Sequence, residues 1–140
     1  MDGPLAGEAV VVQDTAAALQ LWLDRTPTYA THISASMSEL LEIGGTLCGL
    51  DRASSIPGCD ELWYSIEEDL GLILKSLRRS IVIVKKMFGS SGLNGYLSSA
   101  ICAQSWEALH VRFCAEGPTL QERLEQYRVY LQALLAILQG

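Results

Sequence analysis

Apolar side chains recur along most of the chain at spacings of three and four residues, the periodicity of an α-helix with one buried face. No stretch of useful length alternates between apolar and polar residues as a half-buried strand does. Proline and glycine divide the pattern into segments. We therefore predict an all-α fold, an antiparallel bundle of about five helices, with residues 1–140 forming one domain.

The first two helices are predicted on either side of Thr26-Pro27, because proline cannot continue a helix but suits the first turn of the next. The first helix is expected over residues 14–25, and residues 1–13 are expected to be poorly ordered. The second is expected over residues 28–50, with the Gly44-Gly45 pair marking either a close crossing or a kink, or else tolerated glycines near a fraying end. Its apolar face would comprise Tyr29, Ile33, Met37, Leu40, Leu41, Leu47 and Leu50.

A long third helix is predicted from Asp60, a residue suited to capping a helix N-terminus, to Phe88, with Gly89 ending it. Acidic residues stand early in it and basic residues late, an order that complements the helix dipole. Its apolar stripe comprises Leu62, Ile66, Leu70, Ile73, Leu77, Ile81, Val84 and Phe88.

The last two helices are predicted on either side of Gly117-Pro118. In the fifth, Thr119 and Glu122 form a capping box, in which each side chain accepts a hydrogen bond from the other residue's amide. The fourth helix would carry Leu97, Ile101, Cys102, Trp106, Leu109 and Phe113. The fifth shows the clearest seam for helix packing, at Leu120, Leu124, Tyr127, Leu131, Leu134 and Leu138.

Composition narrows the class of protein. A hydrophobic content of 49% with 19% charged residues is globular rather than disordered, and a net charge of −6 argues against nucleic acid as a partner. The start, Met1 to Pro4, lacks the basic residues of a secretory signal, which predicts a cytoplasmic protein. The four cysteines lack metal-ligand spacing, so we expect buried free thiols and no metal site.

No catalytic or cofactor motif is present, so we expect neither an enzyme nor a bound cofactor. If a pocket exists between the helices, the candidates to line it are Trp106, His110 and Cys114, because His110 and Cys114 stand one helical turn apart. A histidine on a helix surface or in a core is the commoner case.

A basic cluster on the third helix is the most suggestive surface feature. It supplies half of the ten basic residues and comprises Lys75, Arg78, Arg79, Lys85 and Lys86. Such a cluster fits a docking strip for an acidic helix or an anionic lipid surface. An ordinary solvated face is the alternative interpretation and the more frequent one.

Two stretches carry a family resemblance. The segment Tyr29-Ala30-Thr31-His32-Ile33, with Leu40-Leu41-Glu42-Ile43 and Leu47-Cys48-Gly49-Leu50-Asp51, resembles the second helix of fungal all-helical N-terminal domains associated with STAND and NACHT NTPases, which include HeLo-like domains. The segment from Trp106 to Arg128 is similar to their C-terminal half. The resemblance spans residues 15–138 and implies a non-enzymatic signalling or adaptor module. The family has no catalytic motif, so no functional residue carries over.

Together these observations favour a non-enzymatic helical module for protein–protein interaction, one that also associates with itself as an oligomer. Two alternatives stay open. One is a membrane-associating module that uses the basic cluster, and the other is a small-molecule-binding or enzymatic bundle with a pocket between helices.

Overall fold

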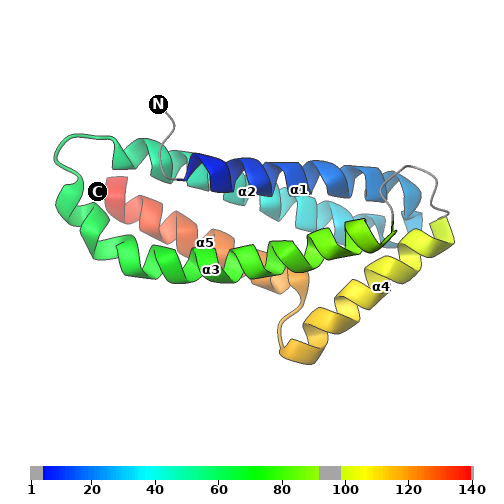
Figure 1. Ribbon diagram of the computed structural model, residues 1–140. Coiled ribbons are helices and arrows are strands. Elements are labelled where there is room, and N and C mark those ends of the chain that lie inside the picture. Colours follow the sequence, from blue (N-terminus) through cyan, green and yellow to red (C-terminus); the bar gives the residue numbers. More distant parts are fainter. Residues whose placement is uncertain (1–4, 92–98, 140) are drawn as a thin grey trace.

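A computed structural model describes residues 5–91 and 99–139. The described chain is all-α, as the periodicity predicted, and it forms a bundle of five helices with one short 3₁₀ helix, η1 (Figure 1). The elements are α1 (Ala6–Arg25), η1 (Pro27–Tyr29), α2 (Ala30–Ser54), α3 (Asp60–Ser91), α4 (Ser99–Glu116) and α5 (Leu120–Gln139).

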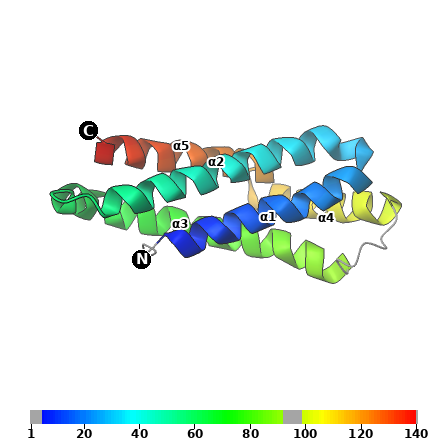
Figure 2. The ribbon, with the colours of Figure 1, turned by 90° about the horizontal axis from the view of Figure 1, so that it is seen from above.

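Helices α1, α2, α3 and α5 lie along one another, and α4 slopes away from them (Figures 1 and 2). The most extensive packing joins α1 to α2 and α2 to α5. Arg128 in α5 pairs with Glu39 in α2, and further along both helices Gly49 lies against Leu135. Helices α2 and α5 are therefore parallel neighbours.

The prediction that the first helix begins at Asp14 is wrong. Helix α1 begins at Ala6, and the side chains of Leu5, Ala9 and Val12 are buried. The Leu5 amide also donates a hydrogen bond of 2.9 Å to the Asp51 carboxylate, which ties the start of α1 to the end of α2. Tertiary burial therefore orders residues 5–13, and residues 1–4 lie outside the described chain.

The Gly44-Gly45 pair marks a close crossing rather than a fraying end, because α2 continues to Ser54. Gly44 is buried, and a Cβ atom built on it would lie 3.0 Å from Cγ of Gln13 in α1. A Cβ on Gly45 would meet no atom within 4 Å. Only the first glycine is therefore required by the approach of α1.

Some predicted core positions face solvent instead. Leu41 is 54% exposed while Ile43 is fully buried, because α1 and α5 pack on different sides of α2. Leu62 and Ile101 are also exposed. Helix α3 continues through Gly89 to Ser91, and Leu97 lies outside the described residues.

The predictions for α5 are confirmed in full. The Glu122 amide donates to Thr119 Oγ1 at 3.1 Å, and the Thr119 amide donates to Glu122 Oε1 at 3.2 Å. All six residues of the seam are buried, namely Leu120, Leu124, Tyr127, Leu131, Leu134 and Leu138. The local capping signal and the packing seam agree on where this helix starts and which side it buries.

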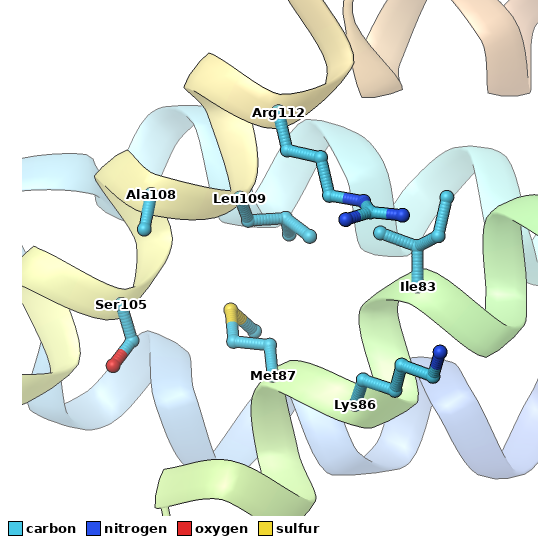
Figure 3. A pocket seen from close by; sticks show the side chains of 7 residues that line it. All are labelled: Ile83, Lys86, Met87, Ser105, Ala108, Leu109 and Arg112. Atoms are coloured by element: carbon cyan, nitrogen blue, oxygen red, sulfur yellow. The ribbon is translucent and has the colours of Figure 1, made fainter.

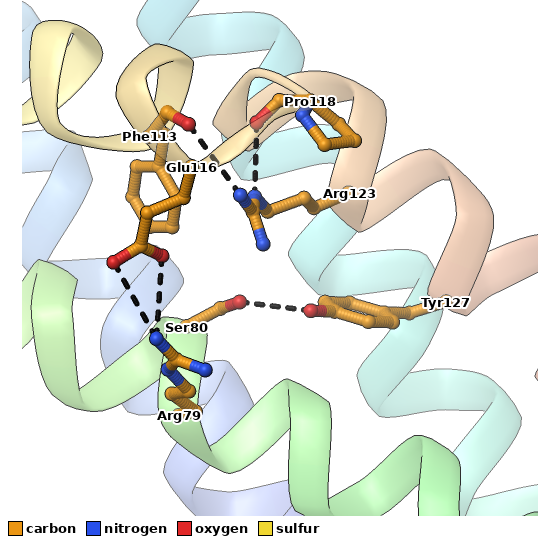
Figure 4. A network of polar contacts seen from close by, with 7 residues as sticks. All are labelled: Arg79, Ser80, Phe113, Glu116, Pro118, Arg123 and Tyr127. Atoms are coloured by element: carbon orange, nitrogen blue, oxygen red, sulfur yellow. Dashed lines mark hydrogen bonds and ion pairs between the residues drawn. The ribbon is translucent and has the colours of Figure 1, made fainter.

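Polar contacts fix α3 and the α4–α5 turn against α5 (Figure 4). The Tyr127 hydroxyl lies 2.8 Å from the hydroxyls of both Ser76 and Ser80 in α3. In the turn, Arg123 donates to the Pro118 carbonyl at 2.9 Å, and its guanidinium stands over the Phe113 ring, 5.1 Å from the centroid. These contacts hold the C-terminal end of α4 close to the bundle.

Candidate functional site

The basic cluster of α3 is exposed, and four of its five members form two rows. Arg78 and Lys85 are seven residues apart, as are Arg79 and Lys86, so each pair stacks on one side of the helix. The first row faces α1, where Arg78 pairs with Glu8. The second faces α4, where Arg79 pairs with Glu116 at 3.4 Å. The five residues therefore do not form a single continuous strip.

Two of the five cations are engaged within the chain. Arg78 and Arg79 each hold a carboxylate of a neighbouring helix. Lys75, Lys85 and Lys86 form no ion pair with any residue in the described ranges. Intramolecular pairing of Arg78 and Arg79 stabilises the packing of α3, and only the lysines are left for an outside anion.

A groove lies between α3 and α4, where α4 slopes away from the core (Figure 3). Its volume is about 260 Å³, and it is open to solvent along one side. The apolar side chains of Met87 and Leu109 point toward one another across it, and Ile83 continues the apolar surface. On the α4 side, the groove is lined by the small side chains of Ser105 and Ala108, so a ligand could approach the α4 backbone closely.

Two cations border this groove, Lys86 from α3 and Arg112 from α4. Their charged ends lie toward the Ile83 end of the groove (Figure 3). In the part of the chain that is described, Arg112 forms no ion pair, and the same holds for Lys86. The groove thus combines an apolar floor with two unneutralised positive charges.

Lys86 was predictable as a contact candidate from the sequence, whereas Arg112 was not. The two residues are 26 positions apart, and only the antiparallel approach of α3 and α4 brings them to one groove. The sequence did contain a pattern that groups Arg112 with other groove residues, because Ser105, Ala108 and Arg112 recur at helical spacing on the same side of α4. Whether these three positions are exposed depends on the placement of α4, which leans away from the core (Figure 1).

A second groove, of about 540 Å³, lies between α1 and α3. It is lined by Val11 and Val82 together with Lys85 and the Glu8–Arg78 ion pair. The carboxylate and guanidinium neutralise one another at its edge. This groove therefore offers one free positive charge, compared with two in the α3–α4 groove.

The pocket predicted around Trp106, His110 and Cys114 exists in part. Trp106 and His110 line a cavity of about 220 Å³, and the chain's other histidine, His32, lines it too. Cys114 is exposed and lies outside the cavity, although its Sγ is 3.5 Å from His110 Nε2. Both histidines therefore share one cavity, which their separation in the sequence did not indicate.

Tyr29 and Glu107 join η1 to α4 at the edge of this cavity. The Tyr29 hydroxyl donates a hydrogen bond to Glu107 Oε1. That hydrogen bond raises the pKa of the Tyr29 hydroxyl above its ordinary value, and partial burial and the negative charge of Glu107 add to the shift. The contact therefore stabilises the protonated phenol.

Metal, thiol and membrane-spanning features can be assessed for residues 5–91 and 99–139. Within those ranges no three His, Cys, Asp or Glu side chains are grouped to hold a metal ion. All four cysteines are free, and the expectation of buried thiols holds at Cys59 and Cys102 but not at Cys48, which is half-buried, or Cys114, which is exposed. None of the described helices contains an apolar stretch long enough to cross a bilayer.

Comparison with known proteins adds no relative. The chain matches no protein-family model, no curated protein and no solved structure. The resemblance to fungal HeLo-like domains therefore stays a prediction.

Proposed function

We propose that this chain is a non-enzymatic helical module that acts by binding another protein through the face formed by α3 and α4. The observation that carries the proposal is the α3–α4 groove, a hollow of about 260 Å³ whose apolar floor of Ile83, Met87 and Leu109 is bordered by two cations. Neither cation forms an ion pair with a described residue. Concave apolar surfaces with a polar rim are the usual sites of recognition. The signalling or adaptor role rests on the family resemblance alone.

The position of α4 supports this choice of face. Helices α1, α2, α3 and α5 bury one another's apolar sides, whereas α4 contacts the bundle mainly through α3. Because α4 leans outside the core, the space beside it is not fully occupied by neighbouring helices. The enzymatic alternative has less support, because the Tyr29–Glu107 contact in the histidine cavity stabilises the protonated phenol, which is a weak nucleophile.

Display selection tests the proposal. Random peptides displayed on phage are selected against the folded full chain, and independent binders are then competed with one another. We expect the binders to compete and to lose binding to Ala108→Trp, because the ring would fill the groove at an exposed position. Ala115→Trp, exposed on α4 outside the groove, is the matched control. Binders spread over unrelated faces would contradict the proposal.

Self-association is tested separately, by the absolute mass from light scattering across a wide range of dilution. A discrete dimer that persists on dilution and is broken by Ala108→Trp would make a second copy the partner at this face. A monomer at every concentration would remove self-association and leave a different protein as the partner.

A further inference from the structure

We propose that the α3–α4 groove holds an acidic amphipathic segment of a partner protein, with an apolar side chain on Met87 and Leu109 and a carboxylate between Lys86 and Arg112. This inference rests on the proposed function, because it names the chemistry of the partner for the same face. The groove residues that carry it are all described, and none belongs to a site assigned above to another role.

Charge complementarity selects an acidic partner. The whole chain carries a net charge of −6, yet the groove is lined by two cations and no acidic residue. The nearest carboxylates on α4 are already engaged, Glu116 with Arg79 and Glu107 with Tyr29. An anion that enters the groove therefore meets positive charge that nothing within the described chain neutralises.

The shape of the groove selects a protein segment over an enclosed small molecule. A volume of about 260 Å³ lies just below the roughly 300–1,000 Å³ of pockets that enclose a drug-sized ligand. It is, however, adequate for one or two anchoring side chains of a helix or extended segment. Ala108 and Ser105 present little bulk, so the backbone of such a segment can approach α4 closely.

The distribution of charge disfavours a lipid surface as the occupant. A flat anionic bilayer would contact an extended basic face, but Arg78 and Arg79 are neutralised by Glu8 and Glu116. The net negative charge of the chain would oppose adsorption to such a surface. A single carboxylate presented between Lys86 and Arg112 avoids both costs.

The test uses peptides selected from the random library on the full chain, and it compares two charge-reversal variants. Lys86→Glu with Arg112→Glu reverses the charge of the groove. Lys75→Glu with Lys85→Glu makes the same change in net charge at exposed positions of α3 outside it. All four side chains are exposed and without an ion pair among described residues, so both variants should fold.

We expect the enriched peptides to carry Asp or Glu beside an aliphatic or aromatic residue. The groove variant should weaken their binding about tenfold or more and flatten its salt dependence, because two charge pairs are lost. The control variant should change binding less than about threefold at moderate salt.

Four results would overturn the inference, the last of them together with the proposed function. Peptides that compete at the groove but are basic or purely apolar would leave the proposed function standing and refute the acidic partner. Acidic peptides that bind both variants equally would place the partner elsewhere. Binding to phosphatidylserine vesicles that only the groove variant loses would assign the cations to a lipid headgroup. Peptides that bind no common face would refute the proposed function itself.

Discussion

The Tyr127 hydroxyl of α5 lies 2.8 Å from the Ser80 hydroxyl of α3, inside the bundle. Ser80 is buried, and Tyr127 is the only polar member of an otherwise leucine-rich seam on α5. The pair therefore fixes how α3 sits on α5, and Met87 of the groove lies two turns further along the same side of α3 as Ser80. A buried hydroxyl that lost this partner would have its desolvation uncompensated.

Tyr127→Phe should lower the free energy of unfolding by about 1–2 kcal/mol, because Ser76 and Ser80 both lose the phenol. The measurement is urea denaturation followed by circular dichroism. Tyr130→Phe, at an exposed position of the same helix, is the control and should change stability by less than about 0.5 kcal/mol. Equal effects of the two substitutions would show that the Tyr127 hydrogen bonds contribute nothing.

The capping box should be measurable by the same method. Thr119→Ala removes the acceptor of the Glu122 amide and should cost about 1 kcal/mol of stability. Thr31→Ala, at an exposed position of α2, removes the same atoms without a capping contact and should be neutral or slightly stabilising. A Thr119→Ala variant as stable as the parent would mean that α5 does not depend on its cap.

The two glycines of α2 should respond differently to alanine. Gly45→Ala should stabilise the protein by up to about 1 kcal/mol, because it improves helix propensity and meets no neighbour. Gly44→Ala should gain less or lose stability, since its Cβ would press on Gln13 of α1. Thermal denaturation of the two variants, and of Gly44→Ala combined with Gln13→Ala, checks this. Equal gains at both positions would contradict a close crossing at Gly44.

The Tyr29–Glu107 contact predicts a pH dependence. The raised pKa of Tyr29 means that the contact contributes its full stabilisation below about pH 10, the ordinary pKa of tyrosine, and loses it as the pH rises through the folded-state pKa. The difference in phenolate absorbance between the parent and Tyr29→Phe reports this titration. In a Glu107→Ala background the midpoint should fall back toward about 10. A midpoint unchanged by Glu107→Ala would show that the carboxylate is not the cause.

Features set by neighbouring residues were predictable from the sequence. The α5 seam and its cap depend on residues within a few turns, so spacing alone identified them. The start of α1 was missed because Ala6 and Ala9 are weakly apolar, and only packing against the rest of the bundle buries that side. Leu41 was wrongly assigned to the core for a related reason. Helices α1 and α5 pack on different sides of α2, and the sequence does not show which positions of α2 those two sides include.

The candidate site was less predictable than the fold. The sequence drew attention to the cations of α3, but pairing of Arg78 with Glu8 and of Arg79 with Glu116 depends on distant segments. The contribution of Arg112 and the meeting of His32 with His110 likewise follow from where α4 lies. Tertiary geometry, which no local pattern encodes, decides which charges remain free.

Nuclear magnetic resonance of the isotope-labelled chain tests the central claim most directly. A peptide from the selection is titrated into the full chain while the backbone amide signals are followed. We predict that the chemical-shift changes concentrate in residues 83–87 and 105–112, the walls of the α3–α4 groove. Changes centred on α2 and α5, or none at saturating peptide, would contradict a protein-binding role for this face.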